Sequence, residues 1–318
     1  MLTTLILSSF LTCVELNCEN LFDTVHDSLK NDIEFTPDGS HRWTRTRYWR
    51  KVNHIAQEII ALGENGQDTH QWSLPSIVVL CEVENDSVMV DLTRKSLLRS
   101  ARYEYLITHS PDQRGINVAM LYDPFLFSPI RSYSLRVPLR ENMRPTRDIL
   151  YVCGRTVDGD TLHVFGVHAP SRTGGERASR PNRMQVERRL AASVDSIYQL
   201  SPDARILITG DFNDYAGSPA LDSLYTHQLV NISEHAVGAN GARGTYRFRG
   251  EWGSLDQMIC SPSLASRTDT CYIGDLSFLL EEDEKYGGVH PRRCYQGPKY
   301  LNGFSDHLPL VAIFRLKR

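Results

Sequence analysis

Hydrophobic and polar positions along the chain follow two periodicities, one typical of strands and one typical of helices. Runs rich in Val, Ile and Leu between turn residues predict strands at 10–17, 76–83, 103–109, 116–124, 149–157, 161–169, 204–212, 254–261 and 309–316. The sequence DGDT at 158–161 predicts a hairpin turn. Apolar residues at helical spacing predict helices at 47–63, 86–101, 180–201 and 218–226.

This order of elements predicts one domain at 10–318, with mixed sheets inside and helices outside. Residues 270–304 read as a long irregular loop, a feature that is often functional. The apolar residues 1–9 predict an N-terminal extension or the remnant of a signal peptide, but no basic residue precedes them. A cytoplasmic location and export therefore both stay open. No other segment predicts an integral membrane span.

Composition narrows the classes of function. The chain has 318 residues, 41% of them hydrophobic and 23% charged, with a net charge of −3. That charge argues against a broadly basic surface that coats nucleic acid, although a local basic patch remains compatible with it. The seven cysteines show no zinc-binding spacing, and most lie in apolar runs. We expect them to be small buried hydrophobic residues without a disulfide framework.

Polar residues stand where several predicted strands end or begin. They are Asn20, Glu82, His168, Asp211, Asn213, Asp256, Asp306 and His307. Each has an ordinary structural interpretation on its own, such as a turn cap for Asn20, a surface acid for Glu82, a core histidine for His168 or an Asx turn at 211–213. Because strand-end loops of α/β proteins converge on one rim, their joint occurrence predicts one assembled site.

Six sequence segments together resemble the endonuclease/exonuclease/phosphatase superfamily of metal-dependent phosphoesterases. They are NCENLF (17–22), CEVEN (81–85), HAPSRTGG (168–175), GDFND (210–214), SLDQMI (254–259) and FSDHLPL (304–310). The longer forms of the first three resemble a bacterial branch whose members mostly lack an assigned substrate. The resemblance spans nearly the whole chain. It implies an α/β (α+β) fold, a four-layer sandwich of two packed mixed β-sheets flanked by helices, with the site at one rim.

The resemblance also implies a metal site. Glu82 matches the metal carboxylate of the family, and Asn20 matches the amide of its first motif near that metal. Asp306 belongs to the same end of the site. Oxygen ligands of this kind suit Mg²⁺ or Mn²⁺.

Five further residues match catalytic positions of the family. Asp211 corresponds to the carboxylate that orients or deprotonates the attacking water, and Asn213 to the amide that holds a phosphoryl oxygen. His307 corresponds to the imidazole on the scissile phosphate, with Asp256 as the acid that orients it. His168 corresponds to a second imidazole on the phosphate. Either Asp211 or the His307–Asp256 pair could take the proton, and we favour Asp211.

Basic residues offer further contacts to phosphate. The candidates are Arg172 in HAPSRTGG, Arg147 in RPTRDIL and Arg114 in DQRGI. Each is either a phosphate ligand or part of a salt bridge at the rim. HRWTRTRYWRK (41–51) mixes basic and aromatic residues, as a nucleic-acid platform does, but the stronger expectation is a helix start that packs its aromatics inward. EEDEKYGG (281–288) is an acidic loop that would repel a polyanion from the site rim.

The predicted function is therefore a divalent-metal-dependent hydrolase of phosphate esters, and the favoured reaction is nuclease-like cleavage of a phosphodiester by an activated water. The partner is a phosphate-ester substrate, with DNA or RNA among the candidates, and a monomer is the simplest state. The alternative is a phosphatase or phosphodiesterase for a small molecule or lipid headgroup, with a closed pocket built by 270–304. A remote alternative is a non-catalytic phosphate-binding module. A serine hydrolase is disfavoured because no G-x-S-x-G sequence is present.

Overall fold

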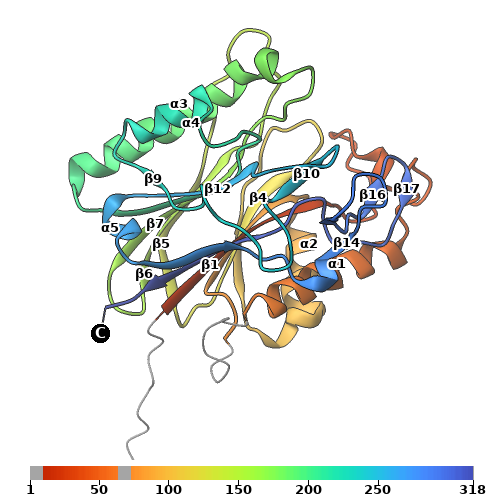
Figure 1. Ribbon diagram of the computed structural model, residues 1–318, viewed down its shortest axis with the longest axis horizontal. Coiled ribbons are helices and arrows are strands. Elements are labelled where there is room, and N and C mark those ends of the chain that lie inside the picture. The colour runs from red at the N-terminus through yellow and green to blue at the C-terminus, as the bar shows by residue number, and fades with distance from the viewer. Residues whose placement is uncertain (1–9, 64–72, 318) are drawn as a thin grey trace, which may run out of the picture.

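Two six-stranded sheets packed face to face form the centre of the computed structural model, which describes residues 10–63 and 73–317 (Figure 1). The first sheet has the order β13-β18-β1-β2-β4-β3, with bounds Thr268–Ile273, Leu310–Arg315, Phe10–Leu21, Ile77–Val83, Asn117–Tyr122 and Glu104–Ile107. The second has the order β5-β6-β7-β8-β12-β9, with bounds Phe127–Leu135, Ile149–Thr156, Thr161–His168, Arg205–Asp211, Asp256–Cys260 and Val230–Asn231. β6 and β7 form the hairpin that the DGDT turn predicts.

Helices cover the outer faces of both sheets (Figure 1). The α-helices are α1 (Arg45–Ala61), α2 (Asp86–Val90), α3 (Glu176–Leu200), α4 (Pro219–Tyr225) and α5 (Pro262–Ala265). Single-turn elements are η1 (Ile33–Phe35), η2 (Asp91–Lys95), η3 (Leu97–Ser100) and η4 (Ser277–Leu279). Three short hairpins pair β10 (Tyr246–Phe248) with β11 (Glu251–Gly253), β14 (Leu280–Glu282) with β15 (Val289–Pro291), and β16 (Tyr295–Gln296) with β17 (Lys299–Tyr300).

Three hydrophobic clusters hold these layers together. The middle cluster lies between the sheets and contains Leu11 and Cys13 of β1 and Leu207 of β8. The other two join α1 to the outer face of the first sheet and α3 to the outer face of the second. This arrangement confirms the predicted four-layer sandwich of two mixed sheets flanked by helices. No helix within 10–63 and 73–317 has the length and hydrophobicity needed to cross a bilayer.

The topology brings several strand ends to one rim. β1 runs parallel to β2 in the first sheet, and β7 runs parallel to β8 in the second. Both pairs end at the same edge of the sandwich, since His168 at the end of β7 lies 3.8 Å from Glu82 near the end of β2. β12 is antiparallel to β8 and therefore begins at that edge. The loop that precedes β18 reaches it as well, since β18 is antiparallel to β1. All strand ends that carry the predicted site residues consequently meet there.

Several elements differ from the sequence-based expectations. β5 was not predicted, because it is an edge strand with mostly exposed residues, a bulge and a proline at position 129, which edge strands tolerate. The single helix expected at 86–101 is instead three short elements: α2, which ends at Val90, followed by η2 and η3. The segment 270–304 is not one irregular loop, since it completes β13 and contains η4 and two hairpins. The predicted extension at 1–9 lies outside the described residues. The seven cysteines are free thiols, five of them buried.

Candidate active site

Strand register lines up three of the predicted side chains across the second sheet. His168 at the end of β7 is paired with Asp211 at the end of β8, and Asp211 is paired with Asp256 at the start of β12. Neighbouring strands lie about 4.8 Å apart, so the three side chains stand in a row on one face. That face is the inner one. Leu207 lies four residues before Asp211, and therefore on the same face of β8, and it packs between the sheets.

Glu82 reaches the same rim from the first sheet through an irregular backbone. A bulge interrupts the pairing of β2 with β4 between Cys81 and Val83, and Glu82 itself has φ +63°. The Glu82 Oε2 atom accepts a hydrogen bond from the backbone N–H of Asn20 (2.9 Å). Asn20 also has a positive φ, +62°. Both side chains therefore leave the regular strand geometry and face the rim.

Asp306 and His307 occupy the loop before β18, and residues in a loop, unlike neighbours on a strand, can both face one site. His307 Nδ1 is 2.8 Å from Oδ2 of Asp256, and both side chains are buried. The hydroxyl of Thr245 donates to the same Asp256 oxygen. The ring of Tyr246 lies against the imidazole, with 5.0 Å between ring centroids. The imidazole is thus held from two sides, while Asp306 forms an ion pair with Arg293 (2.8 Å).

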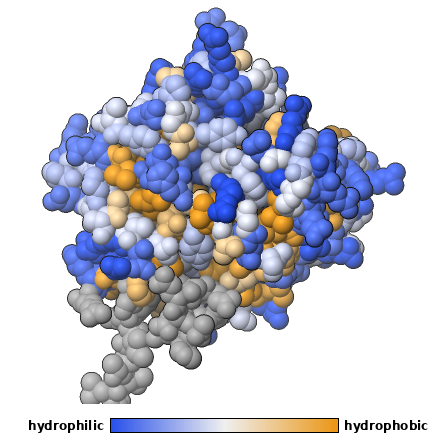
Figure 2. Space-filling model, in the orientation of Figure 1, coloured by the Kyte–Doolittle hydropathy of each residue, from blue (hydrophilic) through white to orange (hydrophobic). Residues whose placement is uncertain are grey.

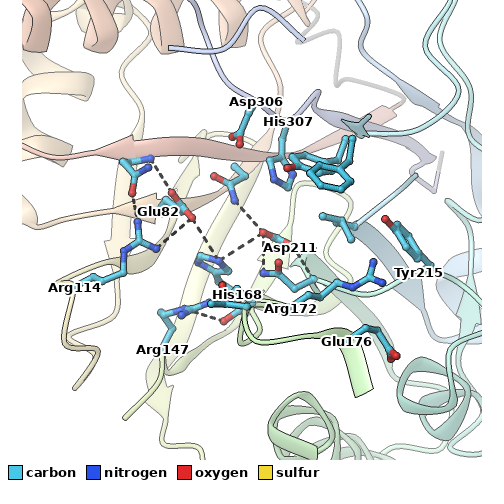
Figure 3. A pocket seen from close by; sticks show the side chains of 18 residues that line it. Glu82, Arg114, Arg147, His168, Arg172, Glu176, Asp211, Tyr215, Asp306 and His307 are labelled. Atoms are coloured by element: carbon cyan, nitrogen blue, oxygen red, sulfur yellow. Dashed lines mark hydrogen bonds and ion pairs between the residues drawn. The ribbon is translucent and has the colours of Figure 1, made fainter. Parts of the chain in front are cut away.

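These side chains border a cavity of about 760 Å³ (Figure 3). Its described lining consists of Asn17, Asn20, Glu82, Arg114, Arg147, His168, Ser171, Arg172, Thr173, Glu176, Asp211, Asn213, Tyr215, Tyr246, Phe248, Leu255, Asp306 and His307. Every predicted site residue lines it except Asp256, which lies behind His307. Figure 3 shows Glu82 and Arg114 on one side of His168, and Arg172 and Tyr215 on the other.

Burial and neighbouring charges set different protonation tendencies for the three central groups. Burial, reinforced by Asp256, raises the pKa of Asp211 to about 7. Burial and the nearby Arg147 lower the pKa of His168 well below its usual value, so its imidazole is neutral. Burial alone would lower the pKa of His307, but Asp256 and other carboxylates outweigh it and raise this pKa well above its usual value. His307 is therefore an imidazolium at neutral pH.

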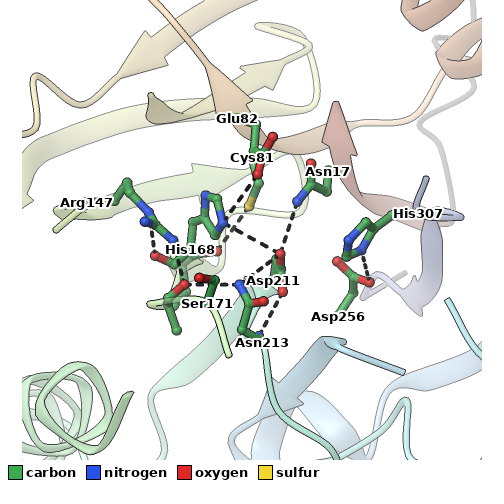
Figure 4. Close-up of polar contacts among 12 residues, drawn as sticks. Asn17, Cys81, Glu82, Arg147, His168, Ser171, Asp211, Asn213, Asp256 and His307 are labelled. Carbon is green, nitrogen blue, oxygen red and sulfur yellow. Dashed lines mark hydrogen bonds and ion pairs between the residues drawn. The ribbon is translucent and has the colours of Figure 1, made fainter. Parts of the chain in front are cut away.

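Asn17 is a site residue that the sequence analysis did not select (Figure 4). Its Nδ2 donates to Oδ2 of Asp211 (3.0 Å), so Asn17, and not Asn20, is the amide of the first motif that touches the central carboxylate. Period-two alternation from the buried Leu11 and Cys13 could have selected it, since both lie on the same face of β1. Asn213 acts on the same group, because its backbone N–H donates to Asp211 Oδ1 (2.7 Å).

The three predicted arginines differ in how free they are. Arg147 is buried and donates to the carbonyl oxygens of His168 and Ala169, which fixes the loop after β7. Arg114 donates to the side-chain oxygen of Asn20. Arg172 lies over the ring of Tyr215, 4.6 Å from its centroid. Of the three, Arg172 has its guanidinium least committed to other groups within the described part of the chain.

The acidic segment predicted as a loop at 281–288 comprises the end of β14 and the turn that leads to β15. Asp283 pairs with Arg247 of β10 (3.4 Å), and β10 also carries Tyr246 and Phe248 of the cavity lining. The hairpin therefore lies beside the cavity wall, where its carboxylates act against the approach of a polyanion from that side.

The residues present fit a hard divalent cation. Glu82 Oε1 receives no hydrogen bond from the described residues, and the nearby nitrogens of His168 and Arg114 lie 3.8 and 3.9 Å away. The side-chain oxygens of Asn20 and Asp306 border the same cavity. Asp211, Asp256 and His307 form another group whose potential ligand atoms lie within 4.8 Å of one another. Since His307 Nδ1 is already bonded to Asp256, we regard that second group as suited to proton handling.

Carboxylates, amides and imidazoles therefore share one rim of a mixed two-sheet sandwich. The sequence matches the Endonuclease/Exonuclease/phosphatase family over residues 12–317, and the chain belongs to that family. No curated protein matches the sequence.

Solved structures share the fold at low sequence identity. A Bacteroides thetaiotaomicron endonuclease/exonuclease/phosphatase family protein is 15% identical with a TM-score of 0.62, over 97% of this chain and 98% of the other. A Bacteroides thetaiotaomicron mannosyl-6-phosphatase is 15% identical with a TM-score of 0.62, over 95% and 98%. Truncated Caenorhabditis elegans TDP2 is 16% identical with a TM-score of 0.59, over 96% and 98%. At this identity the similarity establishes the fold alone.

Proposed function

We propose that this protein is a divalent-metal-dependent phosphodiesterase that cleaves its substrate by in-line attack of an activated water. The observation that carries the proposal is the convergence of a buried carboxylate, Asp211, and two imidazoles of opposite protonation state on one cavity that also contains Glu82. A phosphoryl group in this cavity meets a base, a cation and polar donors at once.

Asp211 is the group that takes the proton from water. Its pKa of about 7 suits a general base at neutral pH, whereas His307 is already protonated and cannot accept a further proton. Asn17 and the backbone of Asn213 orient the carboxylate through hydrogen bonds of 3.0 and 2.7 Å. The proton therefore passes from the attacking water to a carboxylate oxygen of Asp211.

The two imidazoles stabilise the charge that develops on the phosphoryl oxygens, and a metal ion held by other residues of the cavity would add to this stabilisation. His307, held by Asp256, presents a cation to the phosphoryl group, and neutral His168 offers an N–H. Glu82, with Asn20 and Asp306 beside it, would hold Mg²⁺ or Mn²⁺. Such an ion supplies Lewis-acid stabilisation of the phosphoryl and leaving oxygens.

An open cavity supports a diester substrate. A small-molecule phosphatase would be expected to close its pocket with the segment 270–304, but no residue of the described cavity lining comes from that segment. A small phosphate monoester remains the second candidate, because the acidic hairpin beside β10 opposes a long polyanion on that side.

A substrate panel tests the proposal. It contains plasmid, single-stranded DNA, RNA, nucleotides, sugar and inositol phosphates, phospholipids and a chromogenic diester, each with Mg²⁺, Mn²⁺ and Ca²⁺. We expect hydrolysis of diesters that EDTA abolishes and that Glu82→Ala lacks. Activity that survives both treatments would reject the metal mechanism. Hydrolysis of monoesters alone would favour the phosphatase alternative, and no hydrolysis of any substrate would favour a binding module.

Replacement of the base tests its assignment separately. Asp211→Ala should lower turnover by several orders of magnitude while substrate binding is largely kept, because the carboxylate acts on water and not on the substrate. Turnover close to that of the wild type would assign the base elsewhere.

A further inference from the structure

Packing explains only some of the basic and aromatic side chains in the segment 41–51. Trp43 and Tyr48 are buried in the cluster beneath α1, as the structural expectation for this segment requires. Arg42, Arg45 and Arg50 are exposed, and the adjacent Trp49 is only half-buried. Trp49 packs against the edge of that cluster and leaves part of its side chain exposed, whereas the three exposed arginines lie outside the core, so packing does not account for the cations.

A hollow on the surface of α1 brings together two of these arginines and Trp49. It has a volume of about 550 Å³, and its described lining is Arg45, Thr46, Trp49, Arg50, Asn53 and His54. We call it the α1 groove. Two guanidinium groups and a flat indole side by side match the needs of one nucleotide, whose phosphate pairs with arginine and whose base stacks on an aromatic ring. The volume suits such a unit and not a folded domain.

The surroundings of the α1 groove lack acids over two segments of chain. Residues 39–57 and 285–305 contain no Asp or Glu. The two segments pack against each other, since the Arg47 guanidinium lies 4.4 Å from the ring centroid of Tyr300 and His54 Nδ1 is 2.8 Å from the carbonyl oxygen of Gly303. Within the described part of the chain, the basic side chains on this surface that form no ion pair are Arg42, Arg45, Arg47, Arg50, Arg292 and Lys299.

The pKa of His54 is sensitive to the same concentration of positive charge. Its pKa is lowered first by burial and then by the nearby cations Lys51, Arg292 and Arg50. In a chain with a net charge of −3, this is a local surface of the opposite sign. Figure 2 shows hydrophilic side chains over the β16–β17 region on the right of the view, next to this surface.

The α1 groove lies close to the active-site cavity along a short, fixed stretch of chain. Gly303, which contacts His54, precedes Asp306 by three residues, a distance of at most about 10 Å along extended chain. Lys51 of the same helix donates to the carbonyl oxygen of Phe304, which anchors this stretch to α1. A single nucleic-acid strand bound in both the α1 groove and the active-site cavity would therefore have only a few nucleotides between the two places.

We propose that the α1 groove binds a flanking part of a single-stranded nucleic acid whose phosphodiester lies in the active-site cavity. This inference rests on the proposed function and specifies its substrate class. A single strand fits better than a duplex, because Trp49 can stack only on a base that is not already stacked in a helix. A small phosphate ester held in the cavity has no part that extends to the groove.

Charge reversal in the groove tests the proposal without touching the active site. The variant is Arg45→Glu/Arg50→Glu, and the matched control is Arg155→Glu/Arg188→Glu, which changes net charge equally at two exposed arginines outside both cavities. The probes are a fluorescent oligothymidylate of about 12 nucleotides and a small chromogenic diester. Binding of the oligonucleotide is measured by anisotropy in the Glu82→Ala background, and hydrolysis in the wild-type background.

We expect the groove variant to bind the oligonucleotide at least about tenfold more weakly, with a salt dependence reduced by roughly 0.7 per lost phosphate contact. Hydrolysis of the small diester should be unchanged, and the control variant should behave like the wild type. Oligonucleotide affinity within about twofold of wild type would overturn the inference, as would an equal loss in the control. Loss of binding to anionic vesicles with oligonucleotide affinity retained would overturn it in favour of a lipid surface. Failure of the wild type to cleave the small diester would count against the proposed function, while the anisotropy measurement would still decide on the groove.

Discussion

Asp256→Asn is the substitution that most directly tests the imidazole pair. It keeps the size of the side chain and removes the charge that faces His307 Nδ1 at 2.8 Å. Both groups are buried, so water screens their interaction little. Opposite unit charges about 4 Å apart attract by about 4 kcal/mol at an effective dielectric constant of about 20. If the reaction needs the imidazolium, loss of that attraction should lower turnover by about three orders of magnitude, since about 1.4 kcal/mol is a factor of ten.

The pH profile gives a second, independent signature of the same change. Asp256 is the largest of the influences that raise the pKa of His307, and burial is the influence that lowers it. The cationic form, and the stability it contributes, is present at low pH and is lost as pH rises through this raised pKa. Without Asp256, burial dominates, so the alkaline limb of kcat/KM should move to lower pH.

The assay is steady-state hydrolysis of the best diester of the panel across pH, with thermal unfolding measured in parallel. Asp275→Asn is the matched control, because Asp275 is also buried and its carboxylate accepts backbone hydrogen bonds outside the cavity. That control should lower stability and leave the alkaline limb in place. An Asp256→Asn enzyme with turnover within about threefold of wild type and an unmoved limb would refute the role of the pair.

Other expected outcomes concern stability and substrate binding. Burial raises the pKa of Glu58 from 4.5 to about 8, so the stability of the protein falls as pH rises between these values. Glu58→Gln should therefore raise the free energy of unfolding near pH 7 by up to about 3 kcal/mol, as measured by urea denaturation. Arg172→Ala should raise KM about tenfold, and Arg172→Lys should restore only part of the loss, because lysine cannot stack on Tyr215 in the same way. Arg183→Met should lower the free energy of unfolding by about 3–5 kcal/mol, because it leaves Asp214 buried without its partner at 2.9 Å.

Each of these outcomes has a comparison that can contradict it. Glu141→Gln replaces an exposed acid and should leave stability unchanged at all pH values. If it raised stability as much as Glu58→Gln does, burial would not be the cause of the gain at Glu58. Full restoration of KM by Arg172→Lys would show that charge alone matters there. Arg188→Met, at an exposed site on the same helix as Arg183, should cost little, and equal losses at both positions would argue against the buried ion pair.

Much of the rim was predictable because its residues follow strand ends. Asp211, His168 and Asp256 each stand at the end or start of an apolar run, and strand register then places them side by side. Asn17 escaped notice because it lies inside β1, where its polar character looks like an exception within a buried strand. Its proximity to Asp211 depends on how the two sheets face each other, which local sequence patterns do not encode.

The arginines and the segment 41–51 required tertiary structure for a different reason. A long cationic side chain can reach backbone carbonyls, carboxylates or solvent from the same position in sequence, and Arg147 turns to the carbonyl oxygens of His168 and Ala169. In the segment 41–51, helical phase decides which aromatics face the core. Tyr48 and Trp49 are neighbours in sequence, but only Tyr48 is buried completely enough to be a core residue.

Glu82 has a backbone conformation that favours other residue types, so we expect selection for function, and not for folding, to keep a glutamate at this position. Its φ of +63° disfavours a residue with a side chain by about 1–2 kcal/mol relative to glycine, whereas Asn20 and Asn213, which also have positive φ, belong to a residue type that tolerates it better. Relaxed selection should therefore let glycine or asparagine replace the glutamate first. In relatives of this chain, the identity of that one residue should separate lineages that retain hydrolysis from lineages that have kept the sandwich and lost the reaction.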